Sequence, residues 1–266
     1  MVACKSWDRP LDFAGRGCAI HPLEVQSRRV TDLRPMLARF LPLLDPDHFR
    51  DVEFYRGLED IGFRQVLLGG TGSAHLRETV QAVRRETSLK IVLFPVGPDS
   101  VCEADLIVLP DIMNSTAHHA RPFGPTAIMT AVAASEIGCR VLPVAHFIMG
   151  NSTARWYYDA QPIISPKVLA ASCQYAQIVG YRHLALDFED PETPFDPGLA
   201  RVLKSKAPKC HLSVSNECSP HEAQQLVECG VDTVILPSDC LENTDDPLAL
   251  AHAYYRRLLA VEPFRV

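Results

Sequence analysis

The chain has 266 residues, 47% of them hydrophobic, which is enough to fill the core of one large α/β domain or two small ones. Its net charge of -6 excludes a general attraction to nucleic acid or anionic membranes. No apolar run approaches the roughly 20 residues of a membrane-spanning helix and no signal-peptide pattern is present, so we expect a cytoplasmic protein.

Eight short apolar segments, rich in residues that favour strands, follow one another from residue 40 onward. They span residues 40–45, 65–70, 90–95, 106–111, 141–149, 183–188, 211–215 and 232–237. Helical patterns lie between them or after the last, at residues 49–61, 75–87, 126–137, 165–179, 196–206, 220–229 and 247–261. Only the third connection, VGPDSVCEAD, is too short for a full helix.

This alternation predicts the fold class. Continuous apolar strands separated by helices indicate a parallel sheet covered on its outer face. Eight such units in about 220 residues match a (β/α)8 TIM barrel, with a doubly wound open sheet as the alternative. We expect the barrel to occupy residues 37–266, after an N-terminal extension over residues 1–36 that shows no clean periodicity.

The nine cysteines and ten histidines do not follow metal-binding spacings. There is no C-x-x-C pair, and an odd number of scattered cysteines argues against a disulfide framework. His118 and His119 are adjacent, and adjacent side chains on a helix or strand point apart. We therefore expect reduced cysteines and no histidine-based metal site.

A glycine-rich turn lies in the segment LLGGTGSAH, residues 67–75, between an expected strand and an expected helix. Backbone N–H groups left free at such a helix N-terminus suit a phosphate group. The dinucleotide pattern G-x-G-x-x-G fails because His75 stands at the third glycine position, and no Gly-Lys-Ser/Thr of a Walker A loop follows. The turn predicts a phosphate site of another kind, or a tight turn that holds no ligand.

The C-terminal ends of barrel strands carry the active site in this fold class. Asp45 ends the first strand and Thr71 follows the glycine turn after the second, so a carboxylate and a hydroxyl are expected to face a phosphate site. Such oxygen ligands suit Mg²⁺, which takes its remaining ligands from water and substrate phosphate. The alternative is that Asp45 only begins an Asp-Pro turn.

Two further strand ends supply candidates. The segment LDFEDPETPFD carries Asp187, and a carboxylate aimed into the barrel mouth can accept a hydroxyl proton as a general base. His146 lies near the end of another strand, either as a substrate contact or as a core histidine. The aromatic segment NSTARWYYDA, residues 151–160, is long for a connection and is expected to cover a hydrophobic substrate or to form a surface flap.

Taken in order, these segments resemble one family. LPLLDPDH is similar to the motif LLDPDK, VLLGGTG to the turn GGSxG or GGTxG, IVLFPVGPDSVCEADLIVLPDIMNS to LFPGNxxxxxxADAIxxxSLLNS, and SPHEAQQLVECGVDTVI to SPEQAxxxxxAGADxIV. These are motifs of the geranylgeranylglyceryl phosphate synthases and their bacterial heptaprenyl relatives. The resemblance covers about residues 40–245.

The resemblance implies a TIM-barrel prenyltransferase that joins an allylic diphosphate to a hydroxyl of glycerol 1-phosphate, with Mg²⁺ on the diphosphate. It implies that Asp45 and Thr71 hold the metal and that Gly69, Gly70 and Thr71 bind the diphosphate. The family's YLE motif reads ALD here, which places Asp187 at the glutamate position, with Glu189 as the substitute. Residues expected to line the site or the prenyl chain are Asn114 and Ser115, which match the family's NS pair, and Trp156.

The departures from the family lie on the acceptor side. Ala185 replaces the tyrosine of YLE, the GGGI loop reads VSNEC at residues 214–218, and Pro237 replaces a glycine. We therefore expect a different acceptor, as in the moenomycin-type branch, which attaches farnesyl to 3-phosphoglycerate. The candidate acceptor-binding residues are His146, Ser215, Asn216 and Ser238.

The predicted function is ether formation between farnesyl diphosphate and 3-phosphoglycerate with release of diphosphate, as in antibiotic biosynthesis. We also expect a homodimer, peripheral membrane contact for the lipid product and no nucleic-acid partner. The alternatives are a geranylgeranyl or heptaprenyl transferase that uses glycerol 1-phosphate, and a non-catalytic barrel that binds prenyl phosphates. A Schiff-base aldolase is disfavoured because no strand end carries a lysine.

Overall fold

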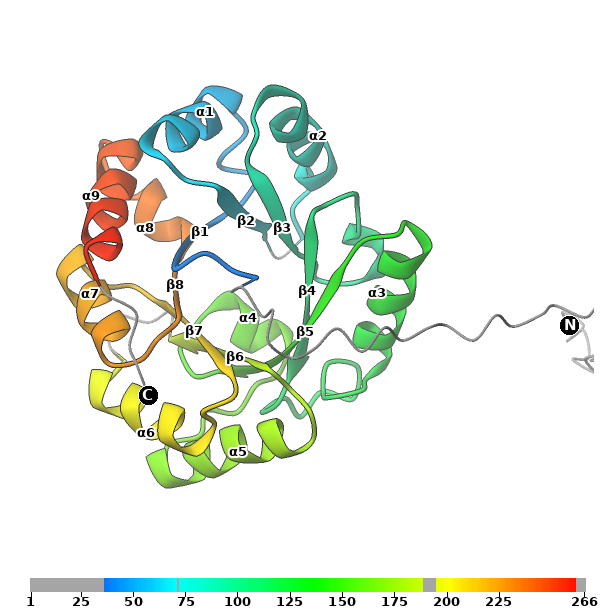
Figure 1. Cartoon of the computed structure of the whole chain (residues 1–266). Helices are drawn as coiled ribbons and strands as arrows, with labels where there is room; N and C mark the ends of the chain where they lie inside the picture. Colours follow the sequence, from blue (N-terminus) through cyan, green and yellow to red (C-terminus); the bar gives the residue numbers. More distant parts are fainter. Residues whose placement is uncertain (1–35, 71, 189–194, 262–266) are drawn as a thin grey trace, which may run out of the picture. The chain divides into compact units, whose positions relative to one another are not determined.

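The computed structural model describes residues 36–70, 72–188 and 195–261. Its strands are all parallel and close into a barrel in sequence order (Figure 1). They are β1 (Phe40–Leu44), β2 (Gln65–Gly69), β3 (Lys90–Phe94), β4 (Leu106–Ile112), β5 (Val141–Ile148), β6 (His183–Phe188), β7 (His211–Asn216) and β8 (Thr233–Leu236). The predicted TIM barrel is confirmed, and the open-sheet alternative is wrong because β1 pairs with β8.

Helices surround the ring of strands (Figure 1). They are α1 (Val52–Ile61), α2 (Leu76–Glu86), α3 (Pro125–Glu136), α5 (Pro166–Ile178), α6 (Pro197–Lys206), α7 (Pro220–Glu228) and α9 (Pro247–Leu259), with short helices α4 (Thr153–Tyr157) and α8 (Ser238–Glu242). The third connection holds only the 3-10 turn η2 (Pro98–Ser100), as expected. The sequence did not predict α4 or α8, which are too short to show a helical period.

Local capping fixes where the helices begin. At α7, the Ser219 side chain accepts from the Glu222 amide at 3.3 Å and the Glu222 carboxylate accepts from the Ser219 amide at 2.7 Å. The predicted start of α1 at Phe49 is wrong, because the Phe49 amide instead donates to the Asp45 carbonyl in a turn. The helix begins after Asp51, whose side chain caps it.

Side chains alternate between the barrel lumen and the layer of helices. On β6, Leu184 and Leu186 belong to the hydrophobic core between strands and helices, so His183, Ala185 and Asp187 face the lumen. The same alternation turns mostly apolar residues inward on β2 to β5 and mostly small or polar residues inward on β6 to β8, with Ile235 on β8 as an apolar exception. The inward residues of the first group include Leu67, Val92, Val108 and Val144, and those of the second include Ala185, Ser213, Ser215 and Thr233.

The barrel wall has a seam between β3 and β4. These strands are in register only at Val92 with Leu106 and at Leu93 with Ile107. By contrast, β4 pairs with β5 over six positions up to Ile112. The upper half of β4 is therefore held from one side only.

Two sequence expectations concern the rest of the chain. In the described ranges all seven cysteines are free, and most of them are buried. Within the same ranges, no helix combines the length and apolar character needed to span a membrane. The expected N-terminal extension lies almost entirely outside the described residues.

Candidate active site

The ends of β1 and β2 bring Asp45 against the glycine turn. A Cβ atom on Gly70 would lie only 2.4 Å from Oδ2 of Asp45, so only glycine lets this carboxylate approach the turn backbone so closely. Oδ1 of Asp45 accepts from the Asp47 amide at 2.9 Å, which is the Asp-Pro turn that the sequence offered as an alternative. The two interpretations are compatible, because no hydrogen bond to Oδ2 is found among the described residues. Thr71, the expected partner, lies outside them.

Asp47 connects two loops at the barrel mouth, the one after β1 and the one before α2. Its carboxylate accepts from the Ser73 hydroxyl at 3.0 Å and from the amides of Ala74 and His75 at 3.3 and 3.2 Å. Nδ1 of His75 lies 2.8 Å from the same carboxylate. The hydrogen bond from the His75 side chain is the main cause that lowers the pKa of Asp47 to about 2. Asp47 thus ties the loop after β1 to the start of α2.

This arrangement corrects one expectation about the glycine turn. The amides at the start of α2 were expected to be free for phosphate, but those of Ala74 and His75 are taken by Asp47. The Gly70 carbonyl accepts from the Ser73 amide at 3.4 Å, and the φ of 83° at Gly72 is one that glycine adopts without strain. The two amides just before α2 are therefore not available to a phosphate.

Asp187 stands on the opposite side of the lumen, at the end of β6. Its side chain is 4% exposed, and its Oδ2 accepts from the Ser152 hydroxyl at 3.4 Å. Ser215 on β7 is in register with it and faces the same way. A buried carboxylate and a hydroxyl therefore lie side by side where the acceptor was expected. The substitute Glu189 lies outside the described residues.

His146 projects from the inner face of β5. It is 7% exposed, its ring packs edge-on against Phe94 at 5.7 Å between centroids, and its Nδ1 has no hydrogen-bond partner among the residues that the structure describes. Burial lowers its pKa to about 4, so the imidazole is neutral at pH 7. Sequence alone left open whether this residue is a substrate contact or a core histidine, and the unpartnered nitrogen inside the lumen favours the first interpretation.

Asn114 and Ser115 hold the segment above the mouth. The Asn114 amide donates to the carbonyls of Ile148 and Gln161 at 2.7 and 2.9 Å, and its oxygen accepts from the Ile148 amide. Ser115 donates to the Tyr158 carbonyl at 2.6 Å. Both residues were expected to line the site, but their polar atoms are engaged with backbone, so they position the segment that contains α4.

The other predicted site residues, Trp156, Asn216 and Ser238, lie apart from one another. Trp156 on α4 is 75% exposed, with the Arg155 guanidinium 5.9 Å from its ring centre. Asn216 follows the outward-facing Val214 by two positions, and its buried Oδ1 has no partner within the described ranges. Ser238 begins α8 at the end of β8 and lies 3.5 Å from a carboxylate oxygen of Asp239. Of the four acceptor candidates, His146 and Ser215 face the lumen most clearly.

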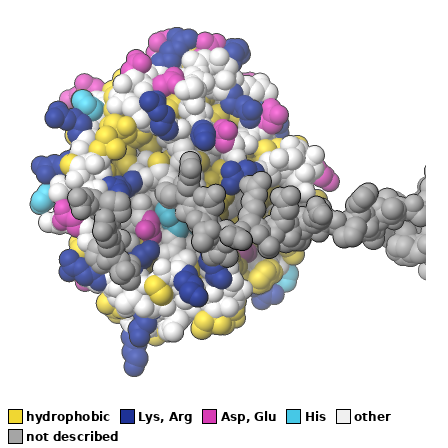
Figure 2. Space-filling model, viewed as in Figure 1, with side chains coloured by type: hydrophobic (Ala, Val, Ile, Leu, Met, Phe, Trp, Pro, Cys, Tyr) yellow, Lys and Arg dark blue, Asp and Glu magenta, His cyan; other side chains and the backbone are white. Residues whose placement is uncertain are grey.

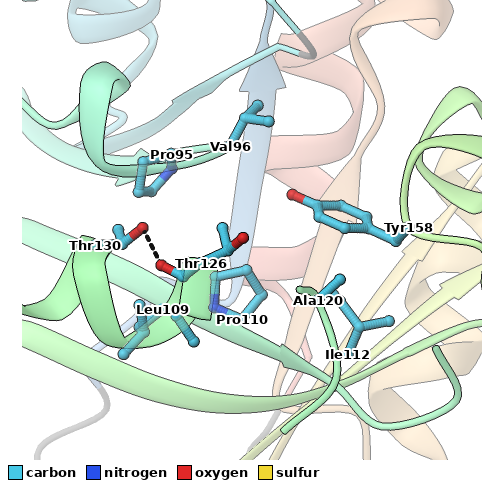
Figure 3. Close-up of a pocket in the computed structure, with 10 residues that line it drawn as sticks. Pro95, Val96, Leu109, Pro110, Ile112, Ala120, Thr126, Thr130 and Tyr158 are labelled. Atoms are coloured by element: carbon cyan, nitrogen blue, oxygen red, sulfur yellow. Dashed lines mark hydrogen bonds between the residues drawn. The ribbon is translucent and has the colours of Figure 1, made fainter. Parts of the chain in front are cut away.

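An apolar pocket occupies the seam between β3 and β4 (Figure 3). Its cavity volume is only about 10 Å³, between the end of β3, the upper half of β4, α3 and the ring of Tyr158. The lining residues are Pro95, Val96, Leu109, Pro110, Ile112, Ala120, Thr126, Ala127, Thr130 and Tyr158. The Thr130 hydroxyl is bonded to the Thr126 carbonyl at 2.7 Å, so this threonine presents little polarity to the pocket.

The charges around the mouth are mixed. Lys and Arg side chains are distributed with Asp and Glu over the face seen in Figure 2. No group of three or more His, Cys, Asp or Glu side chains that could hold a metal occurs in the described ranges. A metal at Asp45 would therefore need oxygen ligands from substrate and water, as Mg²⁺ commonly has.

Comparison with known proteins identifies the family of this chain. A family model described as the PcrB family matches residues 33–248. A geranylgeranylglyceryl phosphate synthase of Cenarchaeum symbiosum is 26% identical over 226 residues, covering 80% of this chain and 90% of the relative. One of Pyrococcus abyssi is 27% identical over 197 residues, covering 70% and 76%.

Solved structures show the same fold. The crystal structure of the geranylgeranylglyceryl phosphate synthase of Thermoplasma acidophilum, in complex with its substrate sn-glycerol-1-phosphate, has a TM-score of 0.75 at 19% identity, covering 84% of this chain and 94% of that one. A thiamine phosphate pyrophosphorylase of Pyrococcus furiosus has a TM-score of 0.53 at 13% identity, covering 83% and 95%. The barrel alone therefore does not define an activity.

Fold and strand-end residues together define a (β/α)8-barrel enzyme of the prenyltransferase class. The chain belongs to the PcrB family.

Sequence reasoning missed several residues that shape the site. The bridging role of Asp47 had no signal, since it depends on a contact with residues about 28 positions later. Ser152 was only part of a segment expected to cover the mouth. Ser213 could have been found from the alternation along β7, which places it inward with Ser215.

The bridge made by Asp47 gives a test of stability. An aspartate with a lowered folded-state pKa stabilises the fold above its ordinary pKa of about 3.9 and loses this contribution as the pH falls toward the folded-state value. We expect Asp47→Asn to lower the free energy of unfolding at pH 7 by about 1 kcal/mol, the usual cost of a lost cap. The difference from wild type should shrink between pH 4 and pH 2, because the folded-state pKa is about 2.

Urea unfolding followed by circular dichroism measures this difference. Asp60→Asn, at an exposed position on α1, is the control for loss of one carboxylate charge. A destabilisation by Asp47→Asn that stays constant down to pH 3 would contradict the electrostatic origin assigned to it.

Proposed function

We propose that this protein joins an allylic prenyl diphosphate to a hydroxyl of a phosphorylated three-carbon acceptor, with release of diphosphate. The observation that carries the proposal is the contact between the Asp45 carboxylate and Gly70, in a chain of the PcrB family. This contact leaves one carboxylate oxygen beside an open glycine turn, opposite the buried carboxylate of Asp187. We assign the diphosphate to the side of the lumen at Asp45 and the acceptor hydroxyl to the side at Asp187.

The metal assigned to the diphosphate side is Mg²⁺. Asp45 and Thr71 would hold it, and the Oδ2 atom of Asp45, which accepts no hydrogen bond from any residue in the described ranges, fits a hard oxygen-ligated cation. When bound, the ion supplies positive charge that neutralises the leaving diphosphate. The backbone amides of the turn at Gly69 and Gly70 stabilise the same negative charge.

The prenyl chain is assigned to the apolar pocket in the seam between β3 and β4. The pocket is adjacent to the barrel mouth and its walls are almost wholly apolar. Each CH₂ group buried there contributes about 0.8 kcal/mol of binding free energy. Tyr158 borders the pocket, and Ser115 holds its backbone in place. The cavity volume of about 10 Å³ is far smaller than a prenyl chain, so a chain such as farnesyl would enter by displacing side chains along the seam.

The acceptor hydroxyl is assigned to the side of Asp187. As C1 of the prenyl chain separates from the diphosphate oxygen, the acceptor oxygen forms the new C–O bond and its proton passes to the carboxylate of Asp187. Ser152 donates to this carboxylate and orients it. Glu189, two residues further along, is the alternative base.

The acceptor we favour is 3-phosphoglycerate. The lumen near Asp187 carries Ser215, His146 and Ala185, in place of the family pattern for glycerol 1-phosphate. The second candidate is glycerol 1-phosphate itself, which is favoured by the geranylgeranylglyceryl phosphate synthases among the relatives. An antibiotic-type product follows from the first acceptor and an ether lipid precursor from the second.

Product formation tests the proposal directly. We expect labelled farnesyl diphosphate, Mg²⁺ and 3-phosphoglycerate to give a labelled ether that survives phosphatase treatment as farnesylglycerate. Geranylgeranyl diphosphate and glycerol 1-phosphate are the comparison substrates, and a characterised archaeal synthase is the positive control. If no donor and acceptor pair gives an ether while the control enzyme does, the protein is a binding barrel rather than a transferase.

The contact between Asp45 and Gly70 provides a second test. We expect Asp45→Ala to lower kcat by at least about 100-fold, as is usual when preorganised electrostatic stabilisation of a leaving group is lost. Gly70→Ala should act in the same direction, because its Cβ would displace the carboxylate. Melting temperatures and kcat are measured together.

The matched control is Gly97→Ala, another glycine after a strand end, where the nearest atom to a Cβ is 3.9 Å away. If Asp45→Ala retains wild-type turnover, the leaving-group side has been placed wrongly. If Gly70→Ala behaves like Gly97→Ala, the close approach has no functional role.

We also propose that the protein is a homodimer that pairs through the outer faces of α3 and α5. Large apolar side chains are exposed there, namely Ile128, Met129, Val132, Val168, Tyr175 and Ile178. A membrane-binding face normally adds several basic residues, whereas α3 has none and α5 has only Lys167. A second copy of the chain is therefore the better partner for this face than a lipid surface.

Sedimentation measures the oligomeric state. We expect wild type at about twice the chain mass of 29.5 kDa and a double variant Val132→Glu with Val168→Glu near the chain mass. Val202→Glu, an equally exposed valine on α6, should leave the dimer intact. A wild-type monomer at micromolar concentration would rule the dimer out, and membrane contact is then tested by vesicle flotation.

A further inference from the structure

Ala185 leaves space inside the barrel. It faces the lumen in the middle of β6, yet it is partly exposed, whereas Leu184 and Leu186 on either side are buried. The next inward residue toward the mouth is Asp187. The space therefore lies directly beneath the carboxylate assigned to the acceptor hydroxyl.

On each of the two strands beside β6, the residue in register with Ala185 is polar. His146 on β5 and Ser213 on β7 are its two register partners. Residues in register on adjacent parallel strands face the same side of the sheet, so all three side chains meet in the lumen.

Neither polar partner has its hydrogen bonds satisfied in the part of the chain that the structure describes. Nδ1 of His146 is buried without a partner. No hydrogen bond of the Ser213 hydroxyl is found there either, although the residue is 3% exposed. The neighbouring Thr233 hydroxyl is already engaged, with the Ala38 carbonyl at 2.7 Å and Nε2 of His211 at 2.8 Å. Buried polar groups normally find partners, so the Nδ1 atom of His146 and the hydroxyl of Ser213 are both available to a ligand.

We propose that His146, Ala185 and Ser213 form a subsite that binds the carboxylate of a phosphoglycerate acceptor and thereby selects it over an acceptor with a hydroxymethyl group. The inference rests on the proposed function and names the chemical feature by which that site chooses its acceptor. Ala185 provides the room, and the other two residues provide the hydrogen bonds.

The spacing of the donors favours a carboxylate. His146 and Ser213 stand two strands apart, which places their backbones on the order of 10 Å from each other. A single hydroxyl oxygen cannot easily meet a donor from each side. The two oxygens of a carboxylate can, with one accepting from the imidazole N–H and the other from the serine hydroxyl.

The charge balance of the subsite is set by His146. The imidazole is neutral when no ligand is bound, because burial disfavours its charged form. A carboxylate in contact with it favours the protonated ring, which then supplies the positive charge that a buried anion requires. Asp187, one inward position closer to the mouth, lies nearest the reacting hydroxyl instead of the carboxylate.

The test compares two acceptors on the same variants. We measure kcat/KM for 3-phosphoglycerate and for glycerol 1-phosphate with labelled farnesyl diphosphate, and take their ratio. His146→Phe and Ser213→Ala should each lower this ratio by about 10- to 100-fold, the usual loss for a hydrogen bond to a charged group. Ala185→Tyr, which fills the space, should lower it at least as much.

His252→Phe and Ser205→Ala remove the same groups from exposed positions on α9 and α6 and should leave the ratio unchanged. His146→Gln, which keeps a donor, should recover part of the loss. Melting temperatures show whether each variant is folded. A ratio that does not move in folded His146→Phe and Ser213→Ala overturns the subsite while leaving the transferase proposal in place.

Calorimetric binding of 3-phosphoglycerate without a prenyl donor separates the two proposals further. Binding that weakens by 10-fold or more in His146→Phe supports the subsite even if no donor is turned over, in which case the transferase proposal fails. Binding of equal strength in wild type and His146→Phe, or no binding to wild type, overturns the subsite.

Discussion

Closure of the sheet by pairing of β1 with β8 is the constraint on which the rest of the structure depends. It brings the carboxyl ends of all the strands to one mouth, so that residues far apart in sequence share one lumen. Asp45 and Asp187 are 142 positions apart in the chain, yet they end strands that open into the same space. Without closure, the acidic and apolar segments would be separate features of an open sheet.

The lumen is divided by the chemistry of its strands. The inward side chains of β2 to β5 are mostly apolar, and those of β6 to β8 are mostly small or polar, apart from Ile235. A reaction between an apolar chain and a polar acceptor needs both surroundings within bonding distance of each other. His146 is a polar residue on the apolar side, and its ring packs edge-on against Phe94.

The fold was largely predictable because the alternation of an apolar strand pattern with a helical pattern repeats along the chain. Eight apolar runs with intervening helical patterns leave few other architectures, and strong caps such as that at Ser219 locate individual helix ends. The short helices α4 and α8 were not predicted, because a helix of about one turn is too short to show a hydrophobic period. The start of α1 was misplaced because a turn at Asp45 uses the amide of Phe49.

The site was predictable only where adjacent strand ends carry it. Asp45 and Gly70 could be paired because consecutive strands of a barrel are neighbours. The occupation of the α2 amides by Asp47, and the use of Asn114 to hold backbone, depend on side-chain directions that no sequence pattern encodes. The same holds for Ala185, whose significance appears only when its register partners are known.

The seam between β3 and β4 has a mechanical consequence. Beyond Ile107, β4 is registered only with β5, so the space beside it can widen by moving side chains, without breaking a ladder of backbone hydrogen bonds. The β1–β2 junction also has only two register pairs, but the β3–β4 seam combines few pairs with an apolar pocket lined by side chains. The prenyl chain that we assign to this pocket would therefore be admitted by movement of side chains along the seam.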